Sequence, residues 1–523
     1  MRTVDAVVIG AGHNGLVAAN KLADAGWDVL VLEAQADPGG AVRSGELTAP
    51  GYVNDLCSSF YPLGAGSPVI AGLGLEEYGL TWRHAPTVLT HVLPDERSVS
   101  LYRDRHRTAE SIAAFHPADA AAWEAECDRW ERIGPALVDA LLSPFPPVRS
   151  GVRLAARLGA ADGLRFARFG ASSVRGYAQE TFAGEGGRNL VAGNALHTDI
   201  SPEATGGAVI GWLLMMLGQH LGFPVPEGGA GRLTQAMAAR FTARGGQLEC
   251  SRPVSRILTA RGIAVGVVDA SGEAIRARRA VLADVSAPTL YTELLNPQIL
   301  PARFRSDLDR FQWDNDVVKV DWALSSPVPW NNPDAHGAGT VHLGTDLDGL
   351  TGYAADLARG RLPETLFLLM GQMTTSDPVR SPAGTESLWA YTHVPRGLLW
   401  TADTAAGYAD RIEELVERYA PGFRGLVKAR AVAAPGVGGH GDVVVNGGTA
   451  AISQQLVFRP VPGLGRADTP IDRLYLASAS AHPGGGVHGA PGNNAAAAAL
   501  ARAGAFGDLY RGTISAIHRT IYR

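Results

Sequence analysis

The sequence predicts an α/β protein organised around a Rossmann-type nucleotide-binding domain, and three consecutive features near its start predict that fold. A run of β-forming residues, Val4–Ile9, leads into the glycine-rich letters GAGHNG at Gly10–Gly15, and a helical pattern then continues to Gly26. A second apolar run, Val29–Leu32, ends in the acidic residue Glu33. Strand, glycine turn, helix, strand and carboxylate in this order are typical of a domain that binds a dinucleotide.

Each part of this motif has a physical role in holding a pyrophosphate. Gly10 makes the tight turn, Gly12 lets the backbone approach the phosphates, and Gly15 lets the helix pack on the sheet. The helix N-terminus offers unpaired N–H groups to the anion, and Glu33 lies where a carboxylate accepts hydrogen bonds from ribose hydroxyls. The predicted cofactor-binding residues of this motif are Gly10, Gly12, His13, Asn14, Gly15 and Glu33.

The residues after the second strand select the cofactor. Asp37-Pro38-Gly39-Gly40 closely follows Glu33, and flavoproteins of the glutathione-reductase type use a second glycine pair at this place to pass close to the FAD pyrophosphate. NAD-dependent dehydrogenases do not usually have it. The sequence therefore predicts FAD, bound by a domain of the glutathione-reductase type, with Gly39 and Gly40 in the cofactor site.

Composition limits the other classes. The 523 residues, 46% hydrophobic and 19% charged, form an ordinary globular chain with room for about three domains. A net charge of −5 argues against a nucleic-acid partner. The first apolar run is a strand and not a signal peptide, and no run reaches the roughly 18 apolar residues of a spanning helix. We expect a cytoplasmic protein.

The cysteines predict no redox centre of their own. Cys57, Cys127 and Cys250 are far apart and form no CxxC pair, so neither a disulfide framework nor a dithiol is supported. A second strand–GxGxxG–helix unit for NAD(P)H, a zinc spacing and a Ser–His–Asp order are also missing. We therefore expect electrons to enter from the substrate, and we expect no metal site.

The middle of the chain predicts a discontinuous architecture. Residues from about 70 to 225 carry helical patterns broken by prolines, and residues from about 290 to 440 carry strand candidates such as Val317–Leu324. Between them, a glycine cluster at Gly228–Gly231 opens a helix, and strands then return to the first sheet. We predict an FAD domain of residues 1–70, 225–290 and 440–523, and an inserted α+β substrate domain of residues 71–224 and 291–439.

Two parts of the first insertion have alternative interpretations. One is a basic amphipathic segment, which either lies in a membrane interface or presents a solvated arginine face over the protein's own core. Only one acid, Asp162, interrupts its arginines, which are Arg149, Arg153, Arg157, Arg165, Arg168 and Arg175. The other is Ala208–Leu217, which is apolar almost all round. This second part is either a buried core helix or the wall of an apolar pocket.

A second strand–glycine loop–helix unit lies near the end of the chain. The apolar strand Asp472–Ala477 leads to the glycine-rich loop His482–Gly492, and an alanine-rich helix begins at Asn493. Its spacing is not GxGxxG, so we expect a different role. The loop can bring backbone N–H groups and a helix dipole against a flavin ring, where they stabilise negative charge.

Five segments together resemble the phytoene desaturase-like flavoproteins, in the branch related to pyridine nucleotide-disulphide oxidoreductase domain proteins. They are the N-terminal GAGHNGLVAANKLADAGWDVLVLEA, Glu33–Gly40, PEGGAGRL from Pro226, Asp377–Pro395 and Leu474–Ala496. The resemblance spans nearly the whole chain. It implies FAD, an inserted substrate domain, and dehydrogenation, saturation or isomerisation of an apolar substrate, sometimes at a membrane surface.

The resemblance also implies further site residues. Val254 matches an adenine-side valine, with ordinary strand packing as the alternative. Related amine oxidases carry an arginine after the glycine pair, where this chain has Ala41, and Arg43 is the nearest basic residue. Lys319 is similar in position to the amine-oxidase lysine near flavin N5, with a salt bridge as the alternative. The residues matched beside the flavin ring are Gly485, Gly486, Val487 and Gly489.

The expected function is that of an FAD-dependent oxidoreductase, a dehydrogenase, desaturase or oxidase that transfers a hydride from an apolar small molecule to flavin N5. The candidate catalytic residues are Lys319 and His482, although His482 can instead cap its loop. Hydride transfer needs orientation and desolvation more than a proton-transfer residue. The alternatives are a flavin amine oxidase and a non-catalytic FAD-containing binding protein. A peripheral membrane contact remains open.

Overall fold

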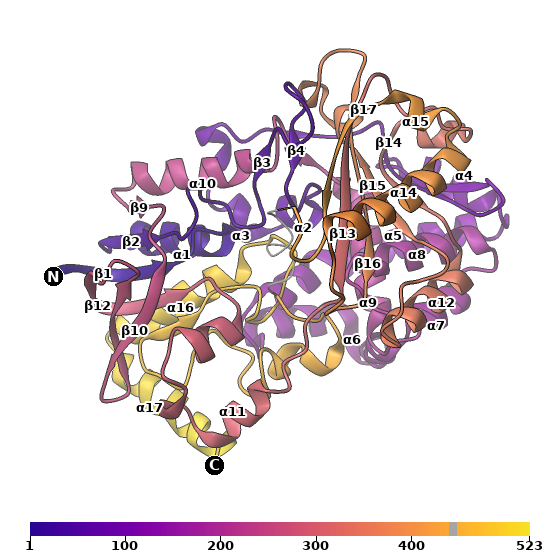
Figure 1. Ribbon diagram of the computed structural model, residues 1–523. Helices are drawn as coiled ribbons and strands as arrows, with labels where there is room; N and C mark the ends of the chain where they lie inside the picture. Colours follow the sequence, from indigo (N-terminus) through magenta and orange to yellow (C-terminus); the bar gives the residue numbers. More distant parts are fainter. Residues whose placement is uncertain (439–446) are drawn as a thin grey trace.

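The computed structural model describes residues 1–438 and 447–523. Two seven-stranded sheets organise these residues and occupy the two halves of the molecule (Figure 1). Both ends of the chain belong to the half that contains the first sheet. The predicted α/β class with a Rossmann-like domain is confirmed. The predicted domain boundary at residue 440 lies outside the described residues.

The first sheet is assembled from three separate stretches of the chain. Its spatial order is β10-β11-β12-β1-β2-β9, and β18 pairs with β12. The pairs β12·β1, β1·β2, β2·β9 and β12·β18 are parallel, whereas β10·β11 and β11·β12 are antiparallel. The strands are β1 (Arg2–Ile9), β2 (Val29–Leu32), β9 (Gln247–Glu249), β10 (Val254–Ala260), β11 (Ile263–Asp269), β12 (Ala274–Ala283) and β18 (Leu474–Leu476).

Helices cover this sheet because its central strands are apolar on both faces. Ala6 and Val8 pack in one cluster with residues of α1 (His13–Asp24), α10 (Gly231–Ala243) and α16 (Ala490–Ala503). Val7 and Ile9, which alternate with them, pack in another cluster on the opposite face. Helix α1 contacts both α10 and α16, so the N-terminal motif lies between middle and C-terminal elements.

The second sheet has the order β17-β13-β16-β15-β14-β6-β7. Its strand β13 contains the predicted Val317–Leu324, and α14 (Ala402–Tyr419) packs on one of its faces. The strands are β6 (Thr87–Val92), β7 (Ser98–Leu101), β13 (Asp316–Leu324), β14 (Ala338–Leu343), β15 (Leu368–Gln372), β16 (Glu386–Val394) and β17 (Val427–Ala433).

The remaining elements connect and cover the two sheets. The helices are α2 (Pro62–Ala65), α3 (Pro68–Ala71), α4 (Arg105–Ala113), α5 (Asp119–Leu142), α6 (Val148–Ala171), α7 (Val174–Thr181), α8 (Glu185–Leu196), α9 (Gly207–Leu221), α11 (Ala302–Leu308), α12 (Leu347–Ala358), α13 (Met373–Ser376), α15 (Phe423–Leu426) and α17 (Gly507–Ile521). The short strands are β3 (Ser44–Gly45), β4 (Asn54–Asp55), β5 (Trp82–Arg83) and β8 (Val225–Pro226).

The apolar segment Ala208–Leu217 lies within α9 and packs in a core. Trp212 and Met216 are completely buried, and the rings of Trp212 and Trp130 meet edge to face with centroids 5.4 Å apart. Edge-to-face aromatic pairs add stabilisation beyond their buried area. Of the two interpretations of this segment, the structure supports the buried core helix.

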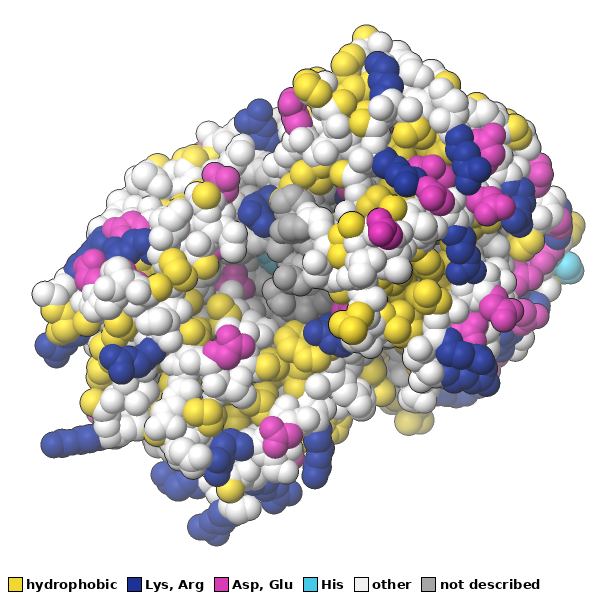
Figure 2. Space-filling model, viewed as in Figure 1, with side chains coloured by type: hydrophobic (Ala, Val, Ile, Leu, Met, Phe, Trp, Pro, Cys, Tyr) yellow, Lys and Arg dark blue, Asp and Glu magenta, His cyan; other side chains and the backbone are white. Residues whose placement is uncertain are grey.

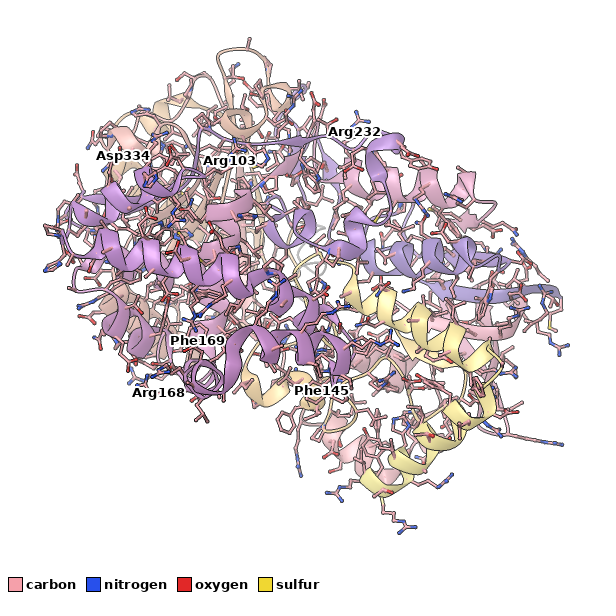
Figure 3. The ribbon with its side chains drawn as sticks, turned by 180° about the vertical axis from the view of Figure 1, so that it is seen from behind. Arg103, Phe145, Arg168, Phe169, Arg232 and Asp334 are labelled. Atoms are coloured by element: carbon pink, nitrogen blue, oxygen red, sulfur yellow. The ribbon has the colours of Figure 1, made fainter. Side chains whose placement is uncertain are left out.

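The basic amphipathic segment forms α6, which lies on the rear of the molecule between the labelled Phe145 and Arg168 (Figure 3). The helix is interrupted at Gly159, whose φ of 66° is not helical. Arg153, Arg165 and Arg168 form ion pairs with nearby carboxylates. Its exposed apolar side chains are Val148, Val152 and Leu164, at 68%, 65% and 77% exposure.

Basic and acidic side chains are interspersed on the face of the molecule that Figure 2 shows, so neither sign of charge dominates that face. Among the described residues, every helix is too short or too polar to cross a lipid bilayer.

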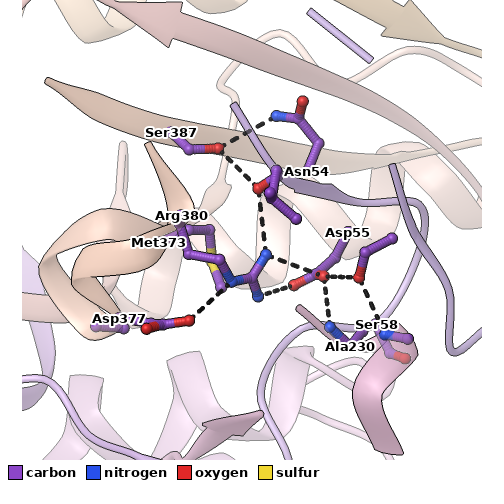
Figure 4. A network of polar contacts seen from close by, with 12 residues as sticks. Asn54, Asp55, Ser58, Ala230, Met373, Asp377, Arg380 and Ser387 are labelled. Atoms are coloured by element: carbon purple, nitrogen blue, oxygen red, sulfur yellow. Dashed lines mark hydrogen bonds and ion pairs between the residues drawn. The ribbon is translucent and has the colours of Figure 1, made fainter. Parts of the chain in front are cut away.

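A buried ion-pair network joins the two halves of the molecule (Figure 4). Arg380 donates to both carboxylate oxygens of Asp55, at 3.1 and 2.6 Å, and lies 3.3 Å from a carboxylate oxygen of Asp377. All three side chains have 0% exposure. The carboxylate of Asp55 also accepts a hydrogen bond from the N–H of Ala230, and the carboxylate of Asp377 accepts one from the N–H of Gly228. The network therefore holds together β4, the segment directly before α10 and the turn before β16.

The charges in this network depend on one another. Burial opposes ionisation of Asp55, but the Arg380 guanidinium holds the pKa of that carboxyl below its ordinary 3.8. A bidentate, charge-assisted pair of this kind is strong when both partners are present. Removal of one partner leaves a buried charge without compensation.

We expect Arg380→Met to lower the free energy of unfolding by about 3–5 kcal/mol at pH 7, because Asp55 and Asp377 lose their shared cation. The deficit should shrink as the pH falls through the pKa of the unpaired Asp55, since a protonated carboxyl needs no counter-charge. Urea denaturation at several pH values measures both effects. The control is Arg83→Met, which removes a half-exposed pair with Glu227 and should cost about 0–1 kcal/mol. Equal losses in the two variants would contradict the prediction.

Candidate FAD and substrate site

The N-terminal glycine turn is tightly packed against the end of β12. A Cβ atom on Gly10, whose φ is +91°, would lie 2.7 Å from the carbonyl oxygen of Asp284. A Cβ on Gly15 would lie 2.2 Å from the carbonyl oxygen of Gly10. Gly12 is the N-cap of α1, and no side chain caps the helix there. Gly12 therefore contributes no cap of its own at the place predicted for the pyrophosphate, and in the first turn of α1 the N–H of Gly15 donates to the carboxylate of Asp284 at 2.8 Å.

Glu33 lies at the end of β2 and faces the same turn. It is 7% exposed, and its carboxylate accepts the N–H of Ala11 at 2.6 Å and that of Gln35 at 2.9 Å. These two hydrogen bonds fix the carboxylate beside the glycine turn. Its position agrees with the predicted ribose contact.

The second glycine pair lies next to the first motif. Gly39 forms an isolated parallel bridge with Gly12, and its N–H donates to Ala11. A Cβ on Gly40 would lie 3.3 Å from the Cα of Gly12. Arg43 donates through Nε to the carbonyl oxygen of Gly40 at 3.0 Å. The glycines of the two motifs therefore form one closely packed strip of backbone, in which Gly15 and Gly39 are buried and Gly10, Gly12 and Gly40 are partly buried. We call it the glycine strip, and its small residues allow a pyrophosphate to approach the backbone.

Val254 begins β10 and is half-buried, packed against the cluster on the second face of the first sheet. Just before it, the N–H of Arg252 donates to the carbonyl oxygen of Glu33, and that of Ser251 donates to Gln35. These hydrogen bonds carry the chain past Glu33 and so place Val254 near the predicted adenosine end.

The C-terminal glycine loop packs directly on the N-terminal motif. A Cβ on Gly492 would lie 1.9 Å from the carbonyl oxygen of Asn14, and one on Gly489 would lie 2.8 Å from the side chain of Val17. Ser67 donates through its hydroxyl to the carbonyl oxygen of His488 at 2.7 Å. The two glycine motifs, at opposite ends of the sequence, therefore meet at the start of α1.

The part of this loop matched to the flavin ring has open space around it. Among the described residues, apart from the chain neighbours of each glycine, no atom lies within 4 Å of a Cβ on Gly485, and a Cβ on Gly486 would meet only the flexible end of Leu63 at less than 3 Å. Val487 adopts a φ of 54°, which is unusual for a branched residue. Open backbone beside a strained residue fits a large flat group such as the isoalloxazine ring.

Lys319 lies on β13 and is 4% exposed. Its Nζ atom lies 2.5 Å from each carboxylate oxygen of Asp321 and 2.9 Å from the carbonyl oxygen of Asp55. The predicted alternative of a salt bridge is therefore present, and it is buried. Through Asp55 the lysine also contacts the segment that leads from the FAD half of the molecule.

Aromatic side chains surround Lys319. In the register of β13 and β16, Tyr391 lies opposite Lys319 and Trp389 lies opposite Asp321. The rings of Trp389 and Tyr391 are nearly parallel, at 19°, with centroids 5.8 Å apart, and Phe60 lies 6.0 Å from Trp389. The same face of the second sheet thus combines one buried cation with flat apolar surfaces.

The histidines near the glycine loop are neutral. His482 contacts the carbonyl oxygen of Ser143 through Nε2 at 3.1 Å, and its ring meets that of Phe145 edge to face. Burial lowers the pKa of His482 to about 4. Burial likewise lowers the pKa of His13 to about 4 and that of His488 to about 3. Among the described residues, no hydrogen bond joins His482 to Lys319, so the structure does not bring the two candidate catalytic residues together.

Sequence reasoning missed Asp284, which follows β12. Its carboxylate accepts the N–H of Gly15 at 2.8 Å, and burial raises its pKa to about 7, with the charge of Glu33 adding to the effect. The only sequence signal was an acidic residue directly after a buried strand. The aromatic residues Trp389 and Tyr391 were also missed, although they lie two residues apart on a predicted strand.

The remaining features of the sequence analysis have the following positions. The three cysteines are free, and burial raises the pKa of the Cys57 thiol to about 11. In the described part of the chain, no group of three or more His, Cys, Asp or Glu side chains could hold a metal ion.

A groove of about 360 Å³ runs between α1, α3, α16 and the end of α5, and its walls include Val17, Val69 and Leu142. None of the predicted site residues lines it.

Comparisons with known proteins give the family. The family model described as flavin containing amine oxidoreductase matches residues 15–500. The pyridine nucleotide-disulfide oxidoreductase domain-containing protein 2 of Rattus norvegicus is 29% identical, over 94% of this chain and 92% of its own length. A neurosporene-forming phytoene desaturase of Rhodobacter capsulatus is 24% identical, over 92% of this chain and 91% of its own.

Solved structures share the fold. A putrescine oxidase bound to putrescine is similar with a TM-score of 0.60 and 16% identity, covering 95% of this chain and 99% of its own. The cyclohexylamine oxidase of Brevibacterium oxydans is similar with a TM-score of 0.58 and 19% identity, covering 95% of this chain and 98% of its own. The family match begins at Gly15, the last glycine of the first motif, and it includes the C-terminal glycine loop and all the named strands of both sheets except β1. The chain thus belongs to the flavin containing amine oxidoreductase family and is an FAD-dependent oxidoreductase.

Proposed function

We propose that the protein is a dehydrogenase, desaturase or oxidase that takes a hydride from an apolar small molecule. The observation that carries this proposal is that each N–H donor of Lys319 already has an acceptor in the protein. Its Nζ atom contacts both carboxylate oxygens of Asp321 and the carbonyl oxygen of Asp55. An ammonium group has three N–H donors, so none remains to hold a water molecule at the ring. We therefore assign Lys319 to the positioning of the segment around Asp55.

The aromatic face supports the same substrate class. Phe60, Trp389 and Tyr391 offer flat apolar surfaces that can orient a hydrocarbon by dispersion and hydrophobic contact. The relatives named phytoene desaturases, matched over most of this chain, support the formation of a carbon–carbon double bond.

FAD, when bound, supplies the acceptor of the hydride. The glycine strip and Glu33 hold its nucleotide end, and the loop His482–Gly492 positions its ring. The aromatic face orients the substrate and excludes water, which favours hydride transfer over side reactions. One substrate carbon loses a hydride with its electron pair, and the neighbouring carbon loses a proton to solvent. The double bond forms between these two carbons.

The FAD half also supports a finer fold assignment, to the glutathione-reductase type. Parallel strands β18, β12, β1, β2 and β9 are joined by the antiparallel pair β10·β11. The strands come from residues within the proposed segments 1–70, 225–290 and 440–523. The strands of the second sheet come from the proposed insertions 71–224 and 291–439.

A flavin amine oxidase is the second candidate. The aromatic rings near Lys319 and the similarity to putrescine and cyclohexylamine oxidases favour it. It requires a water molecule bound by Lys319. This requirement conflicts with an ammonium group whose three N–H donors are already occupied.

Anaerobic titration of the FAD-loaded protein separates the two candidates. We expect bleaching of the flavin absorbance by polyenes or terpenes that can form a new double bond, and none by putrescine or cyclohexylamine. Dithionite provides the control, since it must reduce the same flavin fully. Bleaching by the amines would favour the amine oxidase, and an unbleached flavin across both panels would contradict an enzyme of either kind.

Glu33→Ala tests the cofactor site. We expect the FAD dissociation constant to rise about ten- to hundredfold, because a charge-assisted hydrogen bond of roughly 1.5–3 kcal/mol is lost. Fluorescence titration of the apoprotein with FAD measures it. The matched control is Asp37→Ala, which removes an exposed acid from the same segment and should leave binding unchanged. If Glu33→Ala binds FAD as the wild type does, Glu33 is not a ligand.

We also propose a peripheral membrane contact through α6. Val148 and Val152, four residues apart, share one face of the first part of α6, Leu164 is exposed beyond the interruption at Gly159, and arginines flank these side chains. A helix with exposed apolar residues and basic flanks is suited to an anionic bilayer surface. The ion pairs of Arg153, Arg165 and Arg168 favour the alternative, a solvated basic face.

Sedimentation with vesicles distinguishes these alternatives. We expect the wild type to bind vesicles that contain phosphatidylglycerol, with affinity that falls as salt rises, and to bind pure phosphatidylcholine weakly. The triple variant Val148→Ser, Val152→Ser, Leu164→Ser should lose most of the binding. Leu399→Ser, which alters a 97% exposed leucine elsewhere, should not. A wild type that stays in the supernatant with anionic vesicles would support the solvated face.

A further inference from the structure

Arg459 is a buried cation held entirely by neutral groups. It is 2% exposed. Its Nε donates to the carbonyl oxygen of Ala479 at 3.0 Å, and its two Nη atoms donate to other carbonyl oxygens between 2.6 and 3.3 Å away. These acceptors belong to Gly447, Gly448, Thr449, Gln454 and Ala479. All the donors of the guanidinium are therefore satisfied within the protein.

Among the described residues, Arg459 forms no ion pair within 4 Å, in contrast to Arg380 and Arg240, which are also buried. Carbonyl groups orient and partly solvate a cation, but they carry no net charge. A buried charge is costly unless something compensates it. In accordance with this cost, burial lowers the pKa of Arg459 to about 10. The guanidinium thus remains charged at neutral pH and projects its potential through a low-dielectric interior.

This charge lies directly behind the C-terminal glycine loop. A Cβ on Gly484 would be 3.3 Å from the Cζ atom of Arg459, and Ala479, which binds the guanidinium, lies just before the loop. The charge also reaches both histidines of the loop, since it contributes to the lowered pKa of His482 and of His488. The next residue of the loop, Gly485, has no described neighbour within 4 Å of its Cβ position other than its chain neighbours.

We propose that Arg459 supplies the positive potential that stabilises the negative charge of the reduced flavin. This inference rests on the proposed function, in which the loop His482–Gly492 positions the ring. Every donor of Arg459 is occupied, so it acts through space as an electrostatic residue and makes no contact with the ring. Together with the N-terminal end of α16, it makes this loop the positive side of the flavin site.

Asp314 is the carboxylate that opposes this effect. Burial raises its pKa to about 6, with the neighbouring Asp199 adding to the effect, and Arg459 acts in the other direction. At neutral pH its charge therefore reduces the potential that Arg459 creates. Removing this charge leaves the hydrogen bonds of Arg459 intact.

The test uses the FAD-loaded protein, its reduction potential and its affinity for sulfite. Sulfite donates its sulfur lone pair to the oxidised ring and leaves a negative charge there, so a nearby cation tightens its binding. We expect Arg459→Gln to lower the potential and to weaken sulfite binding at least tenfold. Arg459→Lys, which keeps the charge and loses most hydrogen bonds, should stay within about threefold of the wild type. Asp314→Asn should shift both quantities in the opposite direction to Arg459→Gln.

The control is Arg240→Gln, which removes a buried arginine paired with Asp24 on α1 and should leave the potential and the sulfite affinity unchanged even if the protein is less stable. Wild-type values in Arg459→Gln, or equal losses in Arg459→Gln and Arg459→Lys, would overturn the proposal. If Arg459→Gln does not retain FAD, an unchanged potential in Asp314→Asn would overturn it. FAD retention and substrate bleaching in the wild type test the proposed function separately.

Discussion

Direct backbone contact between the first helix and the last glycine loop holds the cofactor residues together. There is no room for a side chain at Gly492, where a Cβ would lie 1.9 Å from the carbonyl oxygen of Asn14. Because interiors are close-packed, such contacts define position within a few tenths of an ångström. The start of α1, the glycine pair at Gly39 and Gly40, and the backbone at Gly485 take their mutual geometry from this contact.

A second constraint links this cofactor half to the aromatic face. Asp55 accepts from Arg380 through its carboxylate and from Lys319 through its carbonyl oxygen. One residue of the FAD half is thus held by two cations of the other half. Buried ion pairs of this kind stabilise weakly relative to apolar packing, but they define geometry strongly when fully satisfied. The substrate-binding face is therefore oriented relative to the cofactor by charge and not by packing alone.

The sequence analysis was most successful where one residue type has one physical use. Gly10, Gly15 and Glu33 occupy the expected places, since a tight turn, a close helix contact and an acid after a strand allow few alternatives. Side chains whose role depends on distant partners were harder to predict. For Lys319 the sequence favoured a salt bridge or a solvated strand end over a catalytic role, but it could not show that Asp321 and the distant Asp55 together occupy the three donors of this lysine. Asp284 shows only the weak pattern of an acid directly after a buried strand, and Arg459 shows no local pattern, because the role of such a residue depends on its burial and on its distant partners.

The order of the parts along the chain has a consequence for biosynthesis. The first sheet takes strands from residues 2–32, 247–283 and 474–476, and its glycine loop follows the last of these. During translation the early strands leave the ribosome long before β18 and α16 exist. The nascent chain can therefore form the N-terminal turn but not the complete cofactor cradle, and FAD capture must wait until β18, the glycine loop and α16 have been synthesised.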